Sequence, residues 1–136
     1  MTVVLDTSAV LALYDAGEPG HDAMVALVDT LDEDLVATPL AVAEMDALVL
    51  DRGGEPGRDA LWHDLGSSAF AVRWWADAMG ETLAIAAAHP TLGLVDASLV
   101  ALAARVRTQR IATLDQTFAT ITTPDGQPFV LLPGGA

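Results

Sequence analysis

Thr2-Val3-Val4-Leu5-Asp6-Thr7-Ser8 is the stretch from which the fold can be predicted. A short β-branched and aliphatic run such as this is typical of a buried central strand in a parallel sheet. Asp6 falls where the strand should end, and Thr7 and Ser8 can cap the apolar helix that follows. Because ligands of open α/β sheets bind beyond the carboxyl ends of the strands, Asp6 is either a helix cap or a candidate for chemistry.

The rest of the chain alternates predicted helices with predicted strands, which indicates an α/β fold with a mostly parallel sheet. Apolar runs predict strands at 35–37, 110–114 and 129–132, and residues 70–72 fit either a short strand or the approach to a helix. Helical patterns cover 21–31, 39–50, 60–65, 77–88 and 95–106. Stretches rich in glycine and proline predict loops at 15–20 and 52–58. With 136 residues, we expect a single domain, 1–136.

The composition limits the functions that the chain can have. It contains no cysteine, which excludes disulfides, zinc–thiolate sites and thiol nucleophiles. No secretory signal or membrane span is predicted, so we expect a cytoplasmic protein. The net charge of −13, with six arginines and no lysine, offers no basic face for nucleic acid. The acids therefore form an ordinary solvated surface, gather where divalent cations offset them, or attract a basic partner.

Four acids stand out by their positions. Asp6 and Asp115 each follow an apolar strand, and two parallel strands that end alike place both at one edge of the sheet. Glu44 lies on an apolar side of its helix and needs a cation, a proton or an arginine partner there. Asp96 lies in the first turn of a helix, where the dipole alone would favour an acid.

The chemistry that these acids favour depends on what accompanies them. No cysteine or convincing histidine pair is present, and ligands that are all oxygen favour hard cations such as Mg²⁺ or Mn²⁺. Two such ions can activate water and stabilise the leaving oxygen of a phosphodiester. The chain has no Gly-x-Ser-x-Gly elbow and no Gly-x-Gly-x-x-Gly loop, so serine hydrolysis and dinucleotide binding are poorly supported. Arg105, Arg107 and Arg110 are candidate phosphate contacts, although cations at a helix end also suit its dipole.

Four short motifs in this order resemble the acidic motifs of PIN-domain ribonucleases: Leu5-Asp6-Thr7-Ser8, Ala43-Glu44, Leu94-Val95-Asp96-Ala97-Ser98, and Ala112-Thr113-Leu114-Asp115 followed by Phe118. Their spacing and the length of the chain are similar to those of VapC-type toxins from bacterial type II toxin–antitoxin systems. The resemblance implies a three-layer α/β/α sandwich whose sheet has the order 3-2-1-4-5.

The resemblance also implies an activity. The chain would be a metal-dependent endoribonuclease that inhibits translation by cutting transfer or ribosomal RNA, and that leaves a 5′-phosphate and a 3′-hydroxyl. Mg²⁺ or Mn²⁺ would be held by the four acids, Asp6, Glu44, Asp96 and Asp115. Small polar residues beside the acids, Thr7, Ser8 and Thr113, would hydrogen-bond to the carboxylates and orient them. The expected RNA contacts are Arg105, Arg107 and Arg110, and the expected partners are a second copy in a homodimer and an antitoxin that is often basic.

Two alternatives come from other classes of protein. A HAD-like phosphatase also has a nucleophilic aspartate at the end of its first strand, but it needs a second aspartate two residues later, where this chain has Ser8. A catalytically silent acidic α/β module such as a receiver domain needs a lysine at a strand end, and this chain has none. Both fit less well than the ribonuclease.

Overall fold

The structure, a computed structural model, describes residues 1–134. Its centre is a five-stranded sheet in the order β3-β2-β1-β4-β5, in which every neighbouring pair is parallel. The strands are β1 (Thr2–Leu5), β2 (Asp34–Ala37), β3 (Ala71–Val72), β4 (Arg110–Ala112) and β5 (Val130–Leu132). The predicted sheet order is thereby confirmed.

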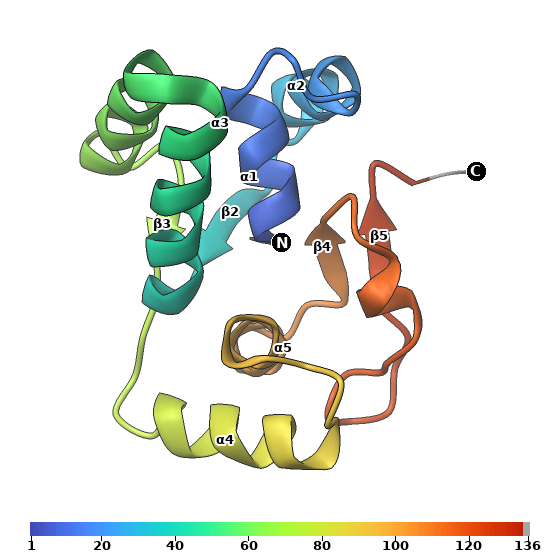
Figure 1. Cartoon of the computed structure of the whole chain (residues 1–136). Coiled ribbons are helices and arrows are strands. Elements are labelled where there is room, and N and C mark those ends of the chain that lie inside the picture. The colour runs from blue at the N-terminus through green and yellow to red at the C-terminus, as the bar shows by residue number, and fades with distance from the viewer. Residues whose placement is uncertain (135–136) are drawn as a thin grey trace.

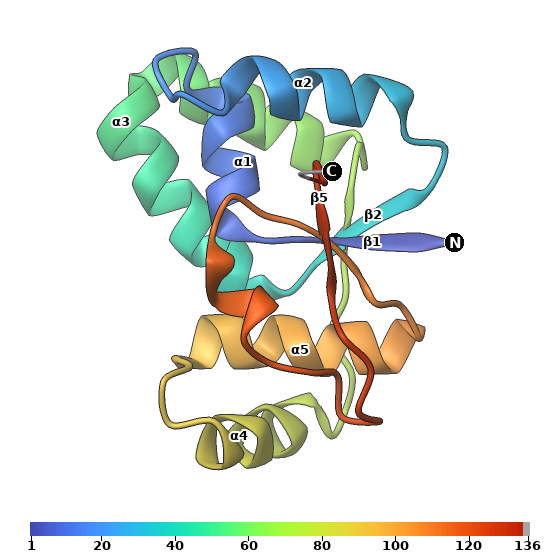
Figure 2. The same cartoon turned by 90° about the vertical axis from the view of Figure 1, so that its right-hand side faces the viewer.

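Helices cover both faces of the sheet (Figures 1 and 2). One face carries α1 (Thr7–Tyr14), α2 (His21–Thr30) and α3 (Pro39–Gly66). On the other face, α5 (Leu94–Val106) lies against the sheet and α4 (Ala78–Ala88) packs outside it. A short 3₁₀ helix, η1 (Gln116–Ala119), follows β4. This is the three-layer sandwich that the resemblance to PIN-domain ribonucleases implies.

The central strand is buried on both faces. Val3, Val4 and Leu5 have no exposed surface, as expected for a parallel strand between two helical layers. The amide of Asp6 continues the pairing with β4 by donating to the carbonyl oxygen of Ala112 at 3.0 Å. Asp6 is thus fixed to the sheet directly beyond the end of β1. Among residues 1–134, no helix is long and apolar enough to cross a bilayer.

The predicted loop at 52–58 is wrong, because helical structure continues through it. Helix α3 runs from Pro39 to Gly66 with a break at Gly54, where φ is +67°. Glycine tolerates this left-handed φ, and Pro56 then falls in the first turn of the second segment, where its missing N–H has no helical partner to lose. Gly53 and Gly57 let the break pack against the backbone of Tyr14, since a Cβ on either would lie 2.9–3.0 Å from its carbonyl oxygen.

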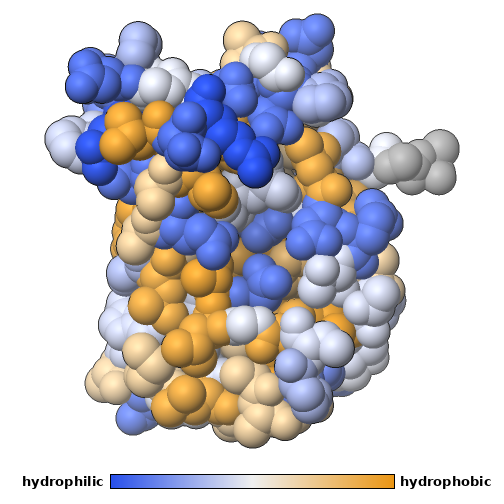
Figure 3. Space-filling view, in the orientation of Figure 1, coloured by the Kyte–Doolittle hydropathy of each residue, from blue (hydrophilic) through white to orange (hydrophobic). Residues whose placement is uncertain are grey.

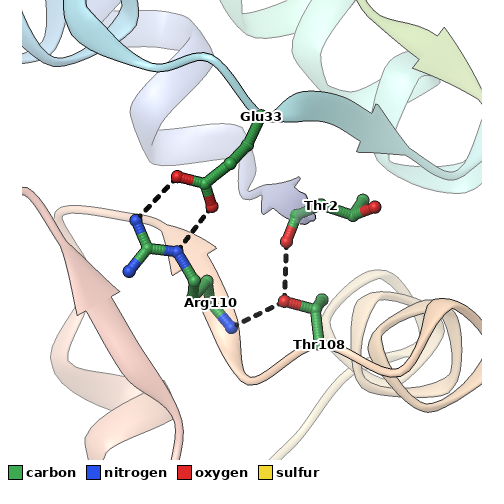
Figure 4. A network of polar contacts seen from close by, with 4 residues as sticks. All are labelled: Thr2, Glu33, Thr108 and Arg110. Atoms are coloured by element: carbon green, nitrogen blue, oxygen red, sulfur yellow. Dashed lines mark hydrogen bonds and ion pairs between the residues drawn. The ribbon is translucent and has the colours of Figure 1, made fainter.

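The amino-terminal edge of the sheet is closed by polar contacts (Figure 4). Arg110 donates to both carboxylate oxygens of Glu33, at 2.6 and 3.0 Å. The hydroxyl of Thr108 donates to the carbonyl oxygen of Thr2 at 2.6 Å and accepts from the amide of Arg110 at 3.1 Å. This network binds β4 to β1 and to the turn before β2, at the end of the strands opposite to Asp6.

Candidate active site

The four acids that the sequence singles out line one open cavity of about 480 Å³. The cavity lies where β1 ends and where α1 and α5 begin, on the left of Figure 2. Asp6 follows β1, Asp115 follows β4, Glu44 belongs to α3 and Asp96 to the first turn of α5. The tertiary fold therefore brings together all four residues, as the sequence predicts.

Asp6 is held by two hydroxyl groups whose own positions are set by the backbone. Ser8 and Thr113 each donate to the same carboxylate oxygen, Oδ2, at 2.7 Å. In turn, the amide of Leu114 donates to Ser8 at 2.9 Å and the amide of Asp115 donates to Thr113 at 2.9 Å. The remaining oxygen, Oδ1, takes no side-chain hydrogen bond from the part of the chain that the structure describes. Asp6 thus has one oxygen anchored and one available to a ligand.

Asp115 is arranged in the same way by a single neighbour. Its Oδ1 accepts from the amide of Thr117 at 2.9 Å and from the hydroxyl of Thr117 at 2.7 Å. This contact caps η1, whose first residue follows Asp115 directly. Within residues 1–134, Oδ2 of Asp115 has no such donor. Two of the four acids therefore offer a preoriented oxygen.

The pKa values show that negative charge accumulates in the cavity. Burial raises the pKa of Asp6 above its ordinary value, although the hydroxyls of Thr113 and Ser8 oppose that rise. The pKa of Asp96 is raised to about 6, first by burial and then by the charges of Asp6, Asp115 and Glu44. Because burial and neighbouring negative charges raise the pKa of both Asp6 and Asp96, the cavity favours protons or a cation that balance the carboxylates.

A hard divalent cation fits this donor set, because all the candidate ligands are carboxylate oxygens and Asp6 and Asp115 each hold one oxygen in place. Among residues 1–134, however, no three acidic or histidine side chains are already close enough to form a metal site. A bound cation would offset the repulsion between these carboxylates and so favour their closer approach. Glu44 is solvent-exposed, so its apolar neighbours do not bury it, and it can move toward a cation.

The small polar residues differ in their roles. Ser8 and Thr113 bond to Asp6 as predicted. Thr7 does not fit the prediction, because its hydroxyl is buried and has no hydrogen-bond partner among the described residues. Thr7 lines the same cavity as the four acids, and its backbone rather than its hydroxyl stabilises the charged form of Asp6. Thr117, which orients Asp115, was not predicted from the sequence. The spacing Asp-x-Thr, typical of an aspartate that caps a short helix, could have indicated it.

The structure does not bring the three candidate arginines to the acids. Arg105 and Arg107 are exposed at the carboxyl end of α5, whereas Asp96 lies at its amino end. Both line a separate groove of about 520 Å³ between α4 and α5. The guanidinium carbon of Arg105 lies 5.7 Å from the centre of the Trp75 ring. Arg110 is engaged by Glu33 at the opposite edge of the sheet.

The surface around the cavity is mixed in character. Figure 3 shows hydrophilic residues at the centre of this face and hydrophobic residues beside them, over α3 and α4. Leu94, which lines the cavity, is an exposed large apolar side chain, and α4 carries two more, Met79 and Leu83. Apolar surface of this kind beside a polar centre is typical of a protein-binding face.

Comparison with known proteins gives the class of protein first. The sequence profile of the PIN domain matches residues 3–123, and the chain belongs to the PIN-domain family. Within that family, it is 35% identical over 135 residues to Ribonuclease VapC26 of Mycobacterium tuberculosis. The alignment covers 96% of this chain and 100% of VapC26. The resemblance to VapC-type proteins predicted from the four motifs is thereby confirmed.

Solved structures support the same fold. The crystal structure of M. tuberculosis VapC20, described as a sarcin–ricin loop cleaving toxin, matches with a TM-score of 0.80 at 21% identity, over 87% of this chain and 93% of that one. A toxin–antitoxin complex from Klebsiella pneumoniae matches with a TM-score of 0.64 at 19% identity, over 88% and 92%. At these identities, the matches concern the fold alone.

Proposed function

We propose that the chain is a metal-dependent endoribonuclease that acts as the toxin of a toxin–antitoxin pair. The observation that carries the proposal is the meeting of Asp6, Glu44, Asp96 and Asp115 on one cavity at the carboxyl edge of the sheet. The similarity to a VapC ribonuclease along nearly the whole chain also supports the proposal. The substrate class is structured RNA of the translation apparatus, transfer or ribosomal, and such a substrate implies a cytoplasmic location.

Mg²⁺ or Mn²⁺ is the cofactor of the proposed reaction, and Asp6, Glu44, Asp96 and Asp115 would hold it. When bound, the ion supplies charge neutralisation and Lewis-acid activation of water for attack on a phosphodiester, which leaves a 5′-phosphate and a 3′-hydroxyl. Oδ1 of Asp6 and Oδ2 of Asp115 are the oxygens that the surrounding hydroxyls leave available. Their fixed partners reduce the entropy that ordering the ligands would otherwise cost.

Ser8 and Thr113 orient Asp6 and also favour its ionised form. Hydrogen bonds to a carboxylate favour its charged form, and here they oppose the rise in pKa that burial causes. Loss of either hydroxyl would therefore weaken the site twice, by freeing the carboxylate and by favouring its protonation. Thr117 orients Asp115 through its amide and its hydroxyl.

The partners of the proposed toxin follow from its charge and surface. A net charge of −13 suits a basic antitoxin, and it leaves attraction of RNA to the bound cation and to local arginines. Arg105 and Arg107 remain candidate RNA contacts only for a substrate long enough to reach the far end of α5. The apolar residues over α3 and α4 offer a face for the antitoxin or for a homodimer.

The test is cleavage of total cellular RNA by the purified protein with Mg²⁺, with Mn²⁺ and with a chelator, followed by mapping of the new ends. We expect discrete fragments that require metal, carry 5′-phosphates and disappear in Asp6→Asn. Asp51→Asn is the matched control, because it removes the same charge from an exposed acid of α3 that does not line the cavity. Cleavage by folded Asp6→Asn, or cleavage in the chelator, would contradict the proposal.

A further inference from the structure

Two buried hydroxyl groups connect the helices that carry Glu44 and Asp96. The Oγ1 of Thr38 and the Oγ of Ser98 lie 2.8 Å apart, and both residues are fully buried. They are sixty positions apart in the sequence. Thr38 is the residue before α3, and Ser98 lies in α5 two residues after Asp96. Neither residue lines the cavity.

The direction of the hydrogen bonds in this pair is determined. Ser98 donates its single hydroxyl proton to the carbonyl oxygen of Val95 at 2.7 Å. The hydroxyl of Thr38 accepts from the amide of Ala41 at 3.2 Å. Thr38 must therefore be the donor to Ser98, which gives one continuous chain of hydrogen bonds from the first turn of α3 to the first turn of α5.

The four acids divide into two kinds by the way in which they are held. Asp6 and Asp115 are anchored by hydroxyl and amide donors of their own. Within residues 1–134, the carboxylates of Glu44 and Asp96 accept no hydrogen bond. Their separation is set only by the placement of α3 relative to α5, and their charges push those helices apart.

The Thr38–Ser98 link lies where it can oppose that repulsion. Thr38 fixes the start of α3, six residues before Glu44, and Val95, which accepts from Ser98, lines the cavity beside Asp96. A buried hydroxyl left without a partner is unfavourable, so the link resists any movement that separates the two helices. An apolar pair would fill the same space without fixing a distance.

We propose that Thr38 and Ser98 are positioning residues, which set the separation of Glu44 and Asp96 and thereby the affinity of the site for Mn²⁺ or Mg²⁺. The inference rests on the proposed metal-dependent function. It predicts that removal of the link weakens metal binding in a protein that is still folded, because the two mobile ligands then start farther apart.

The experiment is titration of the folded protein with Mn²⁺ by calorimetry, without RNA, for the wild type, Ser98→Ala and Thr38→Ser. We expect Ser98→Ala to bind Mn²⁺ about tenfold more weakly, the lower end of the effect of residues that orient metal ligands. Thr38→Ser keeps the hydroxyl and should bind as the wild type does. In RNA cleavage, Ser98→Ala should need about tenfold more Mn²⁺ for half-maximal rate and should recover the wild-type kcat at saturation.

Thr108→Val is the matched control for a purely structural effect. Thr108 also donates to a backbone carbonyl and accepts a backbone amide, but at the opposite edge of the sheet (Figure 4). Its loss should lower stability and leave the affinity for Mn²⁺ unchanged. If Ser98→Ala does not fold, Thr38→Val removes the same hydrogen bond from the other side and takes its place.

Each outcome distinguishes the inference from the function on which it rests. Wild-type affinity for Mn²⁺ in folded Ser98→Ala would overturn the positioning role and leave the nuclease proposal intact. An equal loss of affinity in Thr108→Val would also overturn it, since the effect would then be general destabilisation. Failure of the wild type itself to bind Mn²⁺ would contradict the proposed function and the inference together.

Discussion

Replacing Asp96 by asparagine should stabilise the metal-free protein while abolishing cleavage of RNA. Asp96 lies in a cavity that raises its pKa to about 6 through burial and through the charges of Asp6, Asp115 and Glu44. A carboxylate whose pKa is higher in the folded state than in the unfolded state destabilises the fold wherever it is ionised. Asparagine has nearly the same shape and no charge, so it removes that cost.

The size of the effect follows from the pKa. The difference between 3.8 and about 6 corresponds to ~3 kcal/mol at neutral pH. Solvent screening in the open cavity, and loss of the favourable position of an acid in the first turn of α5, reduce this to roughly 1–2 kcal/mol. For a protein of this length, we expect Tm to rise by about 4–8 °C at pH 7.5.

The dependence on pH tests the cause. The cost of Asp96 is fully present above pH 6 and is relieved as the pH falls from about 6 to 3.8, so the advantage of Asp96→Asn should vanish over that range. Thermal unfolding in a chelator at pH 7.5 and at pH 4 measures the difference in stability between Asp96→Asn and the wild type. Asp51→Asn is the control for the change in net charge. A variant that is less stable than the wild type at pH 7.5, or equally favoured at both pH values, would refute the reasoning.

Three further predictions concern stability. Mn²⁺ should raise the Tm of the wild type, by an amount equivalent to about 2.7 kcal/mol at one hundred times Kd, and a chelator should reverse the gain. Gly57→Ala should lower the free energy of unfolding in urea by about 1–3 kcal/mol, because its Cβ would lie 3.0 Å from the carbonyl oxygen of Tyr14. Gly80→Ala, with open space around the new Cβ, should raise that free energy by ~0.5–1 kcal/mol. Arg110→Ala should cost about 1 kcal/mol through loss of the Glu33 pair, without changing RNA cleavage per folded molecule.

Much of the fold could be predicted because its strands are short apolar runs with no competing pattern. The run before Asp6 and the run before Asp115 each gave a strand of nearly the observed extent. The course of α3 could not be predicted, since a cluster of glycines and a proline has the composition of a loop. Only the fold shows that Gly54 alone leaves helical geometry.

The acids of the site could be predicted, but not the groups that hold them. Asp6 and Asp115 are recognisable because each follows a strand, and local spacing also indicates Ser8. The link between Thr38 and Ser98 joins residues far apart in the chain, and neither residue type indicates a partner by itself. Glu44 is more exposed than its apolar neighbours suggest, because Ala47 is itself exposed and Leu48 lines the open cavity.

The position of β1 at the centre of the sheet has a consequence for biosynthesis. β1 is translated long before β4, its partner on one side, where Leu5 pairs with Ala112. Until that late segment has been translated, the growing chain lacks both a closed core beside β1 and the acid at position 115. Under the proposed function, a nascent chain that ends before β4 therefore lacks the complete site for RNA cleavage.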